Sequence, residues 1–206
     1  MIVNPKLRIA LPGDVDSIVE LHCTAFTDFF LTSLGNSFLS HLYSSFVSDE
    51  HGVCIVAEDN NEIIGFVAGT PNPDEFFRTI KRTKLWNFAF SALPGLIKNP
   101  GLFVRRCFSA LFYKGEPIAG LSDAALLSSL AVDPIVSGSG IGKKLVEAFC
   151  LEMANEGSFS AYLATDAAEN DSVNRFYEKC GFFLESSFSR SGNRTMNRWV
   201  KTLVER

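Results

Sequence analysis

The chain has 206 residues, of which 47% are hydrophobic and 20% are charged. This composition suits one ordinary domain with a sizeable core and excludes a disordered or fibrous protein. The net charge of −4 at pH 7 argues against a nucleic-acid partner, because domains that bind nucleic acids usually carry a basic surface. We therefore expect residues 1–206 to form a single domain.

Cysteine and histidine positions do not predict a disulfide framework or a metal site. The five cysteines include no Cys-x-x-Cys pair, and the three histidines lack metal-ligand spacing. His22 is expected to be only a residue on a helix face. The first residues lack the pattern of a signal peptide, and no run of 18 apolar residues occurs. We expect a cytoplasmic protein without a bound metal.

The predicted elements alternate between strands and helices. Apolar residues recur with strand or helix spacing, and turns rich in Gly, Pro, Asn and Asp separate the segments. In chain order we expect a strand at 7–11, helices at 15–26 (with Asp14 as N-cap) and 36–48, a hairpin of 53–57 and 63–69, a strand at 124–133, a helix at 140–155, a strand at 159–166, a helix at 171–180, and a hairpin of 182–190 and 195–203. This order predicts an α/β fold, with a mixed sheet and helices on both faces.

A basic, aromatic-rich segment interrupts this order. Residues 74–114 hold eight basic and two acidic residues, a net charge of +6, together with many Phe residues and Trp86. Pro-Gly pairs at 94–95 and 100–101 are expected to divide it into short helices. We interpret residues 74–120 as a helical insert of the domain. Three alternatives remain open: a lid with its own core, a basic surface for an anionic acceptor, or a peripheral membrane contact.

The most informative stretch is a strand that runs into a glycine-rich loop and then a helix, residues 130–145. Glycine lets the backbone approach a ligand closely, and the free amides at a helix N-terminus attract anions such as phosphate. Two nucleotide motifs do not fit. A Walker loop would need Gly at 137 and Ser or Thr at 144, where Ser137 and Lys144 stand, and a dinucleotide fingerprint would need Gly in place of Lys143.

Two motifs resemble those of the GNAT superfamily of N-acetyltransferases. The segment from Ser137 to Gly142, SGSGIG, resembles the acetyl-CoA motif Q/R-x-x-G-x-G/A, with Ser137 where Gln or Arg is usual. The segment 170–182, NDSVNRFYEKCGF, resembles the second signature N-x-x-A-x-x-FYEK-x-GF, with Val173 in place of a small residue. The resemblance covers residues 124–182 and implies a GNAT-type fold that uses acetyl-CoA as co-substrate.

The resemblance also implies a cofactor site in the gap between two splayed central strands. Strand backbone would pair with the pantetheine arm, loop amides would hold the pyrophosphate, and asparagine side chains of the second signature would bind the cofactor. The implied cofactor-binding residues are Leu130, Ala131, Val132, Ser137, Gly138, Ser139, Gly140, Ile141, Gly142, Lys143, Asn170, Asn174, Phe176, Tyr177 and Lys179.

The implied chemistry is direct attack of an amine on the thioester within a ternary complex. An alkylamine has a pKa near 10.4 and must lose a proton before it attacks. By resemblance, the Val132 amide would stabilise the oxyanion and Tyr177 would be the general acid. Asp28, Asp123 and Asp166 are candidates for the base, although each fits the role of a turn or cap residue better.

The acceptor is expected to be a small-molecule amine. If the basic segment binds this acceptor, we expect the acceptor to carry an anionic group as well. Residues 28–35 and 186–196 should line its site. A homodimer is left open. The alternative function is a non-catalytic acyl-CoA sensor or a membrane-docked module, which the absence of an obvious base and the change at Ser137 favour.

Overall fold

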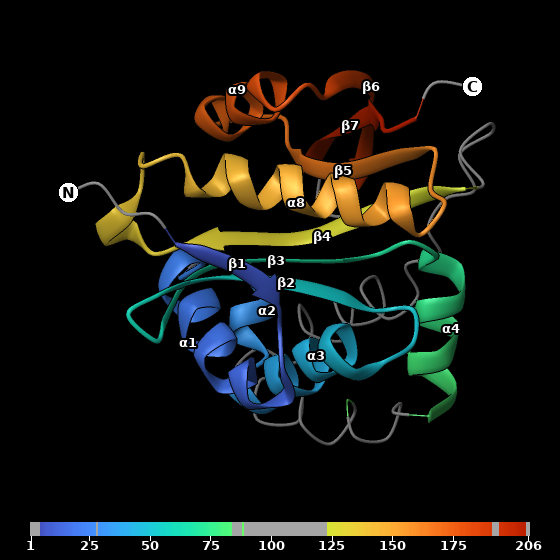
Figure 1. Ribbon diagram of the computed structural model, residues 1–206. Coiled ribbons are helices and arrows are strands. Elements are labelled where there is room, and N and C mark those ends of the chain that lie inside the picture. Colours follow the sequence, from blue (N-terminus) through green and yellow to red (C-terminus); the bar gives the residue numbers. More distant parts are fainter. Residues whose placement is uncertain (1–4, 28, 84–87, 89–122, 191–193, 205–206) are drawn as a thin grey trace.

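The computed structural model describes residues 5–27, 29–83, 88, 123–190 and 194–204. They form one seven-stranded mixed sheet in the order β1-β2-β3-β4-β5-β7-β6 (Figure 1). The strands are β1 (Lys6–Ile9), β2 (Val53–Asp59), β3 (Glu62–Thr70), β4 (Ala124–Val132), β5 (Ser160–Asp166), β6 (Phe183–Arg190) and β7 (Arg194–Thr202). The β4–β5 pair is parallel, and the other neighbours are antiparallel.

Helices cover both faces of this sheet, which confirms the predicted α/β class (Figure 1). One face carries α1 (Val15–Ala25) and α3 (Asn36–Ser48), and the other carries α8 (Ile141–Asn155). The remaining helices are α2 (Phe30–Ser33), α4 (Pro73–Thr83) and α9 (Asp171–Lys179). The predicted loop at 28–35 therefore contains a single helical turn.

Strand alternation sorts the core into two layers. Successive side chains of a strand point to opposite faces of the sheet. On β2, Val56 packs in the cluster formed with α1 and α3, whereas Ala57 packs in the cluster formed with α8. On β3, Phe66 and Val67 divide in the same way. The central strands β2 and β3 are thus buried on both sides of the sheet.

Asp14 is the N-cap residue of α1, as predicted, although its carboxylate makes no cap bond with this helix. It accepts a hydrogen bond from the Leu11 amide at 2.7 Å and pairs with Arg8 at 2.6 Å. Arg8 also pairs with Glu58 at 2.6 Å. The hydrogen bond from Arg8 lowers the pKa of Asp14, so this network ties β1, β2 and the start of α1 together through charge.

The first part of the predicted insert is a helix that packs on the domain. On α4, Phe76 and Ile80 are buried, and the Phe76 ring stacks on Phe46 at 4.6 Å between centroids. The helices expected after Thr83 lie outside the described residues, apart from Phe88, which is buried. None of the described helices has both the length and the apolar content to cross a bilayer.

Candidate functional site

Strands β4 and β5 separate at the centre of the sheet. Their parallel pairing runs from Ala124 to Leu126 on β4, although this strand continues to Val132. On its other edge β4 stays paired with β3, and the Asp133 amide donates to the Ile64 carbonyl at 2.9 Å. Alternate residues of an antiparallel strand direct their backbone groups to opposite edges. The amides of Leu130 and Val132 therefore point away from β3, toward the gap.

The glycine-rich loop lies where β4 ends and is shaped by two left-handed residues. Gly138 and Gly140 have φ of 81° and 85°, which favours glycine. Gly140 is the N-cap of α8, and a Cβ at either glycine would meet no atom within 4 Å. The space before the loop is therefore open. The amides of Ile141, Gly142 and Lys143 precede the first intrahelical bond, from Lys144 to Gly140 at 3.1 Å.

The third glycine of the loop has a packing role. A Cβ on Gly142 would lie 3.4 Å from the Phe176 ring and 3.6 Å from Val132. The absence of a side chain lets α8, α9 and the end of β4 come close together. Phe176 thus lies under the loop as part of its support.

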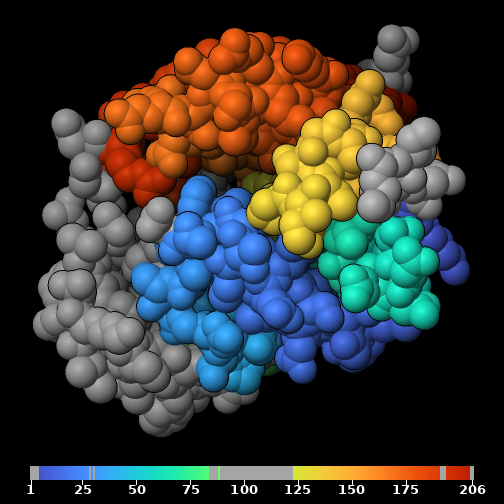
Figure 2. Space-filling view, turned by 90° about the vertical axis from the view of Figure 1, so that its left-hand side faces the viewer, coloured from blue at the N-terminus to red at the C-terminus, as the bar shows by residue number. Residues whose placement is uncertain are grey.

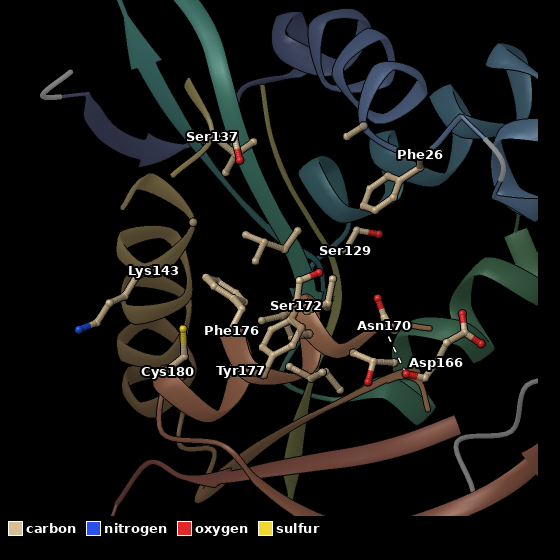
Figure 3. Close-up of a pocket in the computed structure, with 18 of the residues that line it drawn as sticks. Phe26, Ser129, Ser137, Lys143, Asp166, Asn170, Ser172, Phe176, Tyr177 and Cys180 are labelled. Atoms are coloured by element: carbon tan, nitrogen blue, oxygen red, sulfur yellow. Dashed lines mark hydrogen bonds between the residues drawn. The ribbon is translucent and has the colours of Figure 1, made fainter. Parts of the chain in front are cut away.

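Two asparagines join α9 to the end of β5. Asn170, the N-cap residue of α9, donates from Nδ2 to the Asp166 carbonyl at 3.3 Å (Figure 3). Asn174 Nδ2 donates to the same carbonyl at 3.3 Å, and its Oδ1 accepts from the Thr165 hydroxyl at 2.6 Å. Trp199 Nε1 donates in turn to Thr165 at 2.8 Å. The side chain of Asn174 is therefore engaged at both ends by the protein.

Tyr177 lies on the groove side of α9, and its ring is held by aromatic neighbours. It contacts Phe176 and Phe182 edge-on, with centroids 5.1 Å and 5.8 Å apart. Burial raises the pKa of the Tyr177 hydroxyl above its usual value, so the group stays protonated at neutral pH.

A groove of about 770 Å³ joins these parts. Figure 2 shows it as a hollow between the orange surface of α9, the yellow loop and the blue segment of α1. The close-up in Figure 3 shows Ser137 and Lys143 toward one side, Phe26 toward another, and Phe176 and Tyr177 between them. The groove therefore continues from the glycine loop to the end of α1.

Most of the residues predicted for the cofactor line this groove. They are Leu130, Val132, Ser137, Gly138, Ser139, Gly140, Ile141, Gly142, Lys143, Asn170, Phe176, Tyr177 and Lys179. Two predicted residues do not line it: Ala131 is buried in the α1–α3 cluster, and Asn174 is engaged as described above. Ser172 and Thr165 line the groove but were not predicted. Ser172 could have been found, because it follows Asn170 on the exposed start of the same helix.

The opposite end of the groove brings together parts of both segments expected to bind the acceptor. Phe29 and Leu31 line it from the α1 side, and Arg194 and Met196 line it from β7. Arg194 is held in a bidentate ion pair by Asp166, with the shortest contact at 2.6 Å. These walls are mainly apolar, with one neutralised pair of charges at the edge.

The three candidate bases do not converge on the gap. Asp166 lines the groove but is paired with Arg194. Asp123 is exposed and precedes β4 at the end where this strand still pairs with β5. Asp28 lies outside the described residues. No described carboxylate therefore stands unpaired beside Leu130 and Val132 within the groove lining.

His22 is a groove residue that the sequence did not reveal. It was expected on a helix face, but its side chain is buried with only 2% exposed, and Nδ1 lies 2.6 Å from the Tyr43 hydroxyl. Tyr43 in turn hydrogen-bonds with Ser129 of β4. Burial lowers the pKa of His22 to about 4. No sequence signal could have shown this, because the three residues are far apart in the chain.

Comparison with known proteins agrees with this architecture. The model of the acetyltransferase (GNAT) family matches residues 98–182, which contain both motifs. No curated protein sequence matches the chain.

Several solved structures share the fold. An acetyltransferase of 22% identity has a TM-score of 0.66, with 97% of this chain and 100% of that chain covered. The ribosomal-protein-S18-alanine N-acetyltransferase of Escherichia coli has 12% identity and a TM-score of 0.61, with 98% and 96% covered. An aminoglycoside 6'-N-acetyltransferase in complex with coenzyme A has 16% identity and a TM-score of 0.61, with 98% of each chain covered.

Proposed function

Because residues 98–182 match the model of the acetyltransferase (GNAT) family and the fold is that of GNAT acetyltransferases, we propose that this chain moves an acetyl group from acetyl-CoA to the amine of a small acceptor. The observation that carries the proposal is the gap between β4 and β5, which leads directly into the glycine loop. Acetyl-CoA would supply an acyl thioester, an electrophile that an uncharged amine can attack. The acceptor class and the roles of individual residues are part of the proposal.

The glycine loop fits a pyrophosphate. The open space before Gly138 and Gly140, together with the free amides of the first turn of α8, makes a concave donor surface at the positive end of a helix dipole. Ser137 stands where the family usually has Gln or Arg, so backbone donors would make most of the contact. Lys143 is 58% exposed and lies 3.7 Å from Glu147, and it can turn toward a phosphate.

The edge of β4 fits the extended arm of the cofactor. The amides of Leu130 and Val132 face a gap that no other strand fills, so an extended ligand can add there as a strand would. In this position the Val132 amide would donate to the carbonyl oxygen as negative charge develops on it. A fixed donor of this kind typically contributes about 10²–10³-fold to kcat.

Tyr177 is proposed as the general acid. Its hydroxyl is protonated at neutral pH, which is the form that an acid needs, and the aromatic contacts hold the ring in one place. The hydroxyl would donate to the thioester sulfur as the carbon–sulfur bond breaks, and water in the groove would restore its proton. The raised pKa makes the Tyr177 hydroxyl a weaker acid, so its catalytic effect depends on its position close to the sulfur.

The described walls favour an acceptor that carries an apolar group beside its amine. Phe29 is 52% exposed at the mouth, and Leu31 and Met196 continue the apolar wall. The anionic acceptor that the basic segment suggests would rely on residues outside the described part, because Asp166 already neutralises Arg194.

Calorimetric titration with acetyl-CoA, followed by a CoA-release screen of amines, tests the proposal. Ligand at about 100 times its dissociation constant should add roughly 2.7 kcal/mol to the free energy of unfolding. The amine panel would include phenethylamine, amino sugars, polyamines and amino acids. Folded protein that shows neither binding nor a thermal shift with millimolar acetyl-CoA would refute the proposal.

A non-catalytic acyl-CoA sensor is the second candidate. The observation that favours it is the absence of an unpaired carboxylate in the described lining of the groove. A sensor would bind acetyl-CoA in the titration and release no CoA with any amine. Turnover of one amine of the panel excludes a pure sensor.

A further inference from the structure

His22 has one ring nitrogen with a partner and one without. Nδ1 lies 2.6 Å from the Tyr43 hydroxyl, whereas Nε2 is buried and has no hydrogen-bond partner in the described part of the chain. An unpaired buried polar atom destabilises the folded state. His22 lines the groove where the acceptor is proposed to bind. A ligand in the groove could therefore supply the missing hydrogen-bond partner of Nε2.

The position of His22 fits the acceptor amine rather than acetyl-CoA. His22 lies on α1 and lines the groove together with Ala25 and Phe26. Figure 3 shows Phe26 on the side away from Lys143 of the glycine loop. The Phe26 ring lies 4.8 Å from the imidazole, and Phe26 itself is only partly buried as the C-cap of α1. A shift of this ring would open Nε2 to the groove.

We propose that His22 is the base of the reaction, and that its Nε2 accepts a hydrogen bond and then the proton from the acceptor amine. The amine can attack only if its own lone pair is free. It must therefore donate an N–H to His22, which requires the tautomer with hydrogen on Nδ1. In that tautomer Nδ1–H donates to the Tyr43 oxygen, and the Tyr43 hydroxyl is free to turn its own hydrogen toward its neighbour Ser129. This inference rests on the proposed acetyl transfer.

The same chain gives the proton a route that leaves the imidazole neutral. As the new carbon–nitrogen bond forms, the amine proton moves to Nε2, the Nδ1 proton moves to the Tyr43 oxygen, and the Tyr43 proton moves to Ser129. Ser129 lines the groove, and its own proton passes through groove water to Tyr177, which has given its proton to the sulfur that leaves. One proton is lost by nitrogen and one is gained by sulfur, which balances the reaction.

The surroundings explain why a relay suits this site better than a lasting positive charge. No carboxylate among the described residues acts on His22, and desolvation lowers its pKa to about 4. The titratable groups that act on Tyr43 are Cys23 and Cys54, whose pKa values burial raises, so that both are neutral thiols. A buried imidazolium would thus have no counter-charge, whereas a concerted relay creates none.

Variants of His22 and Tyr43 test the proposal. The acceptor is phenethylamine, chosen because Phe26 and Phe29 form an aromatic wall, or any other amine that the screen returns. His22→Gln and His22→Phe should lower kcat/KM for the amine by about 10²–10⁴-fold. Tyr43→Phe should give an intermediate loss. The matched control is His51→Gln, whose residue lies outside the groove lining. Calorimetry should show acetyl-CoA affinity unchanged in all four variants.

The solvent isotope effect separates a relay from a structural role. Wild-type kcat/KM in mixtures of H₂O and D₂O should show a curved proton inventory, which becomes linear in His22→Phe and Tyr43→Phe. A His22→Phe variant within about twofold of wild type would overturn the proposal. An equal loss of acetyl-CoA affinity and turnover would overturn it too, because that pattern indicates a structural role.

A spectroscopic measurement keeps the test independent of turnover. If the wild type binds acetyl-CoA but acetylates no amine, the proposed function fails, and His22 can still be examined. The ¹⁵N shift of His22 Nε2 should change when phenethylamine is added to the protein with CoA, and His22 should remain neutral from pH 6 to 8. An unchanged shift at saturating amine would overturn the assignment.

Discussion

The Thr165 hydroxyl donates to Asn174 Oδ1 at 2.6 Å and accepts from Trp199 at 2.8 Å. This pair ties α9 to the end of β5 and to β7 at once. Asn174 belongs to the second GNAT-like motif, whose resemblance implied a direct contact with the cofactor. In the structure its side chain fixes the position of α9, and with it the position of Phe176 and Tyr177.

Asn174→Ala and Thr165→Val should therefore have similar effects. Each removes the hydrogen bond between the two residues and one more, from Asn174 to the Asp166 carbonyl or from Trp199 to Thr165. At about 1 kcal/mol for each bond, each substitution should lower Tm by about 4–8 °C for a domain of this size. Both should weaken acetyl-CoA binding to a comparable extent in calorimetry, because α9 loses its anchor. A much larger loss of affinity in Asn174→Ala alone would show that the amide contacts the cofactor directly.

Tyr177→Phe should lower kcat with little change in the KM for acetyl-CoA. The substitution keeps the ring and its contacts with Phe176 and Phe182, and it removes only the hydroxyl. Loss of a general acid typically costs about 10²–10⁴-fold. Steady-state kinetics with the amine that the screen returns measures this effect. Full turnover in the variant would remove Tyr177 from the mechanism and leave the Val132 amide as the main contributor.

Gly140→Asp should severely weaken acetyl-CoA binding. Its carboxylate would stand before the free amides of α8 and repel the pyrophosphate. Since Gly140 has φ of 85°, any side chain also adds backbone strain. Gly140→Asn is the matched control, because Asn tolerates this conformation and carries no charge. Calorimetry should show a much greater loss for Asp than for Asn, and equal losses would indicate that the phosphates lie elsewhere.

Asp14→Asn should destabilise the fold in a pH-dependent way. The pKa of Asp14 is lower in the folded state than its unfolded value of about 3.9. Its ion pair with Arg8 therefore stabilises the protein above that pH, and this contribution is lost as pH falls through the folded pKa. Denaturant titrations should show a difference from wild type of about 1–2 kcal/mol at pH 7, shrinking below about pH 4. A constant difference would contradict this assignment.

Peripheral membrane contact through the basic segment remains a proposal that α4 allows us to test. Lys81 and Arg82 lie at its C-terminal end, after the buried Phe76 and Ile80. If this segment docks on anionic membranes, wild-type protein should sediment with phosphatidylserine vesicles at low salt, and Lys81→Glu/Arg82→Glu should abolish it. Lys143→Glu/Lys144→Glu on α8 is a charge-matched control. Wild-type protein that stays in the supernatant would exclude this contact.

The sequence was sufficient for the fold because its signals are local. Alternating apolar residues and turn residues predicted the hairpin of β2 and β3, and the two glycine-bounded motifs predicted α8 and α9 with their neighbouring strands. The predicted bounds of α3 agree with those of the structure, Asn36–Ser48. The two motifs also predicted most of the groove lining at the loop, because both lie on elements that meet at the same sheet gap.

Long-range pairing accounts for what the sequence could not show. Asp14 is the N-cap residue of α1 as predicted, but its carboxylate makes charge-assisted hydrogen bonds with Arg8 in place of a cap bond. The partner of His22 is 21 residues away on another helix, and the next member of that chain is on β4. No local pattern identifies such partners, so the acceptor end of the groove emerged only from the structure.

The short pairing of β4 with β5 also bears on how this domain opens. Three residue pairs, Ala124–Ser160 to Leu126–Tyr162, are the whole ladder between the first four strands and the last three. Elements joined by few backbone bonds can separate below the free energy of global unfolding. An extended ligand in the gap would contact both β1–β4 and β5–β7 and so hold these two groups of strands together. Acetyl-CoA should therefore slow amide hydrogen exchange in β5, β7 and α9, far beyond the residues that it touches.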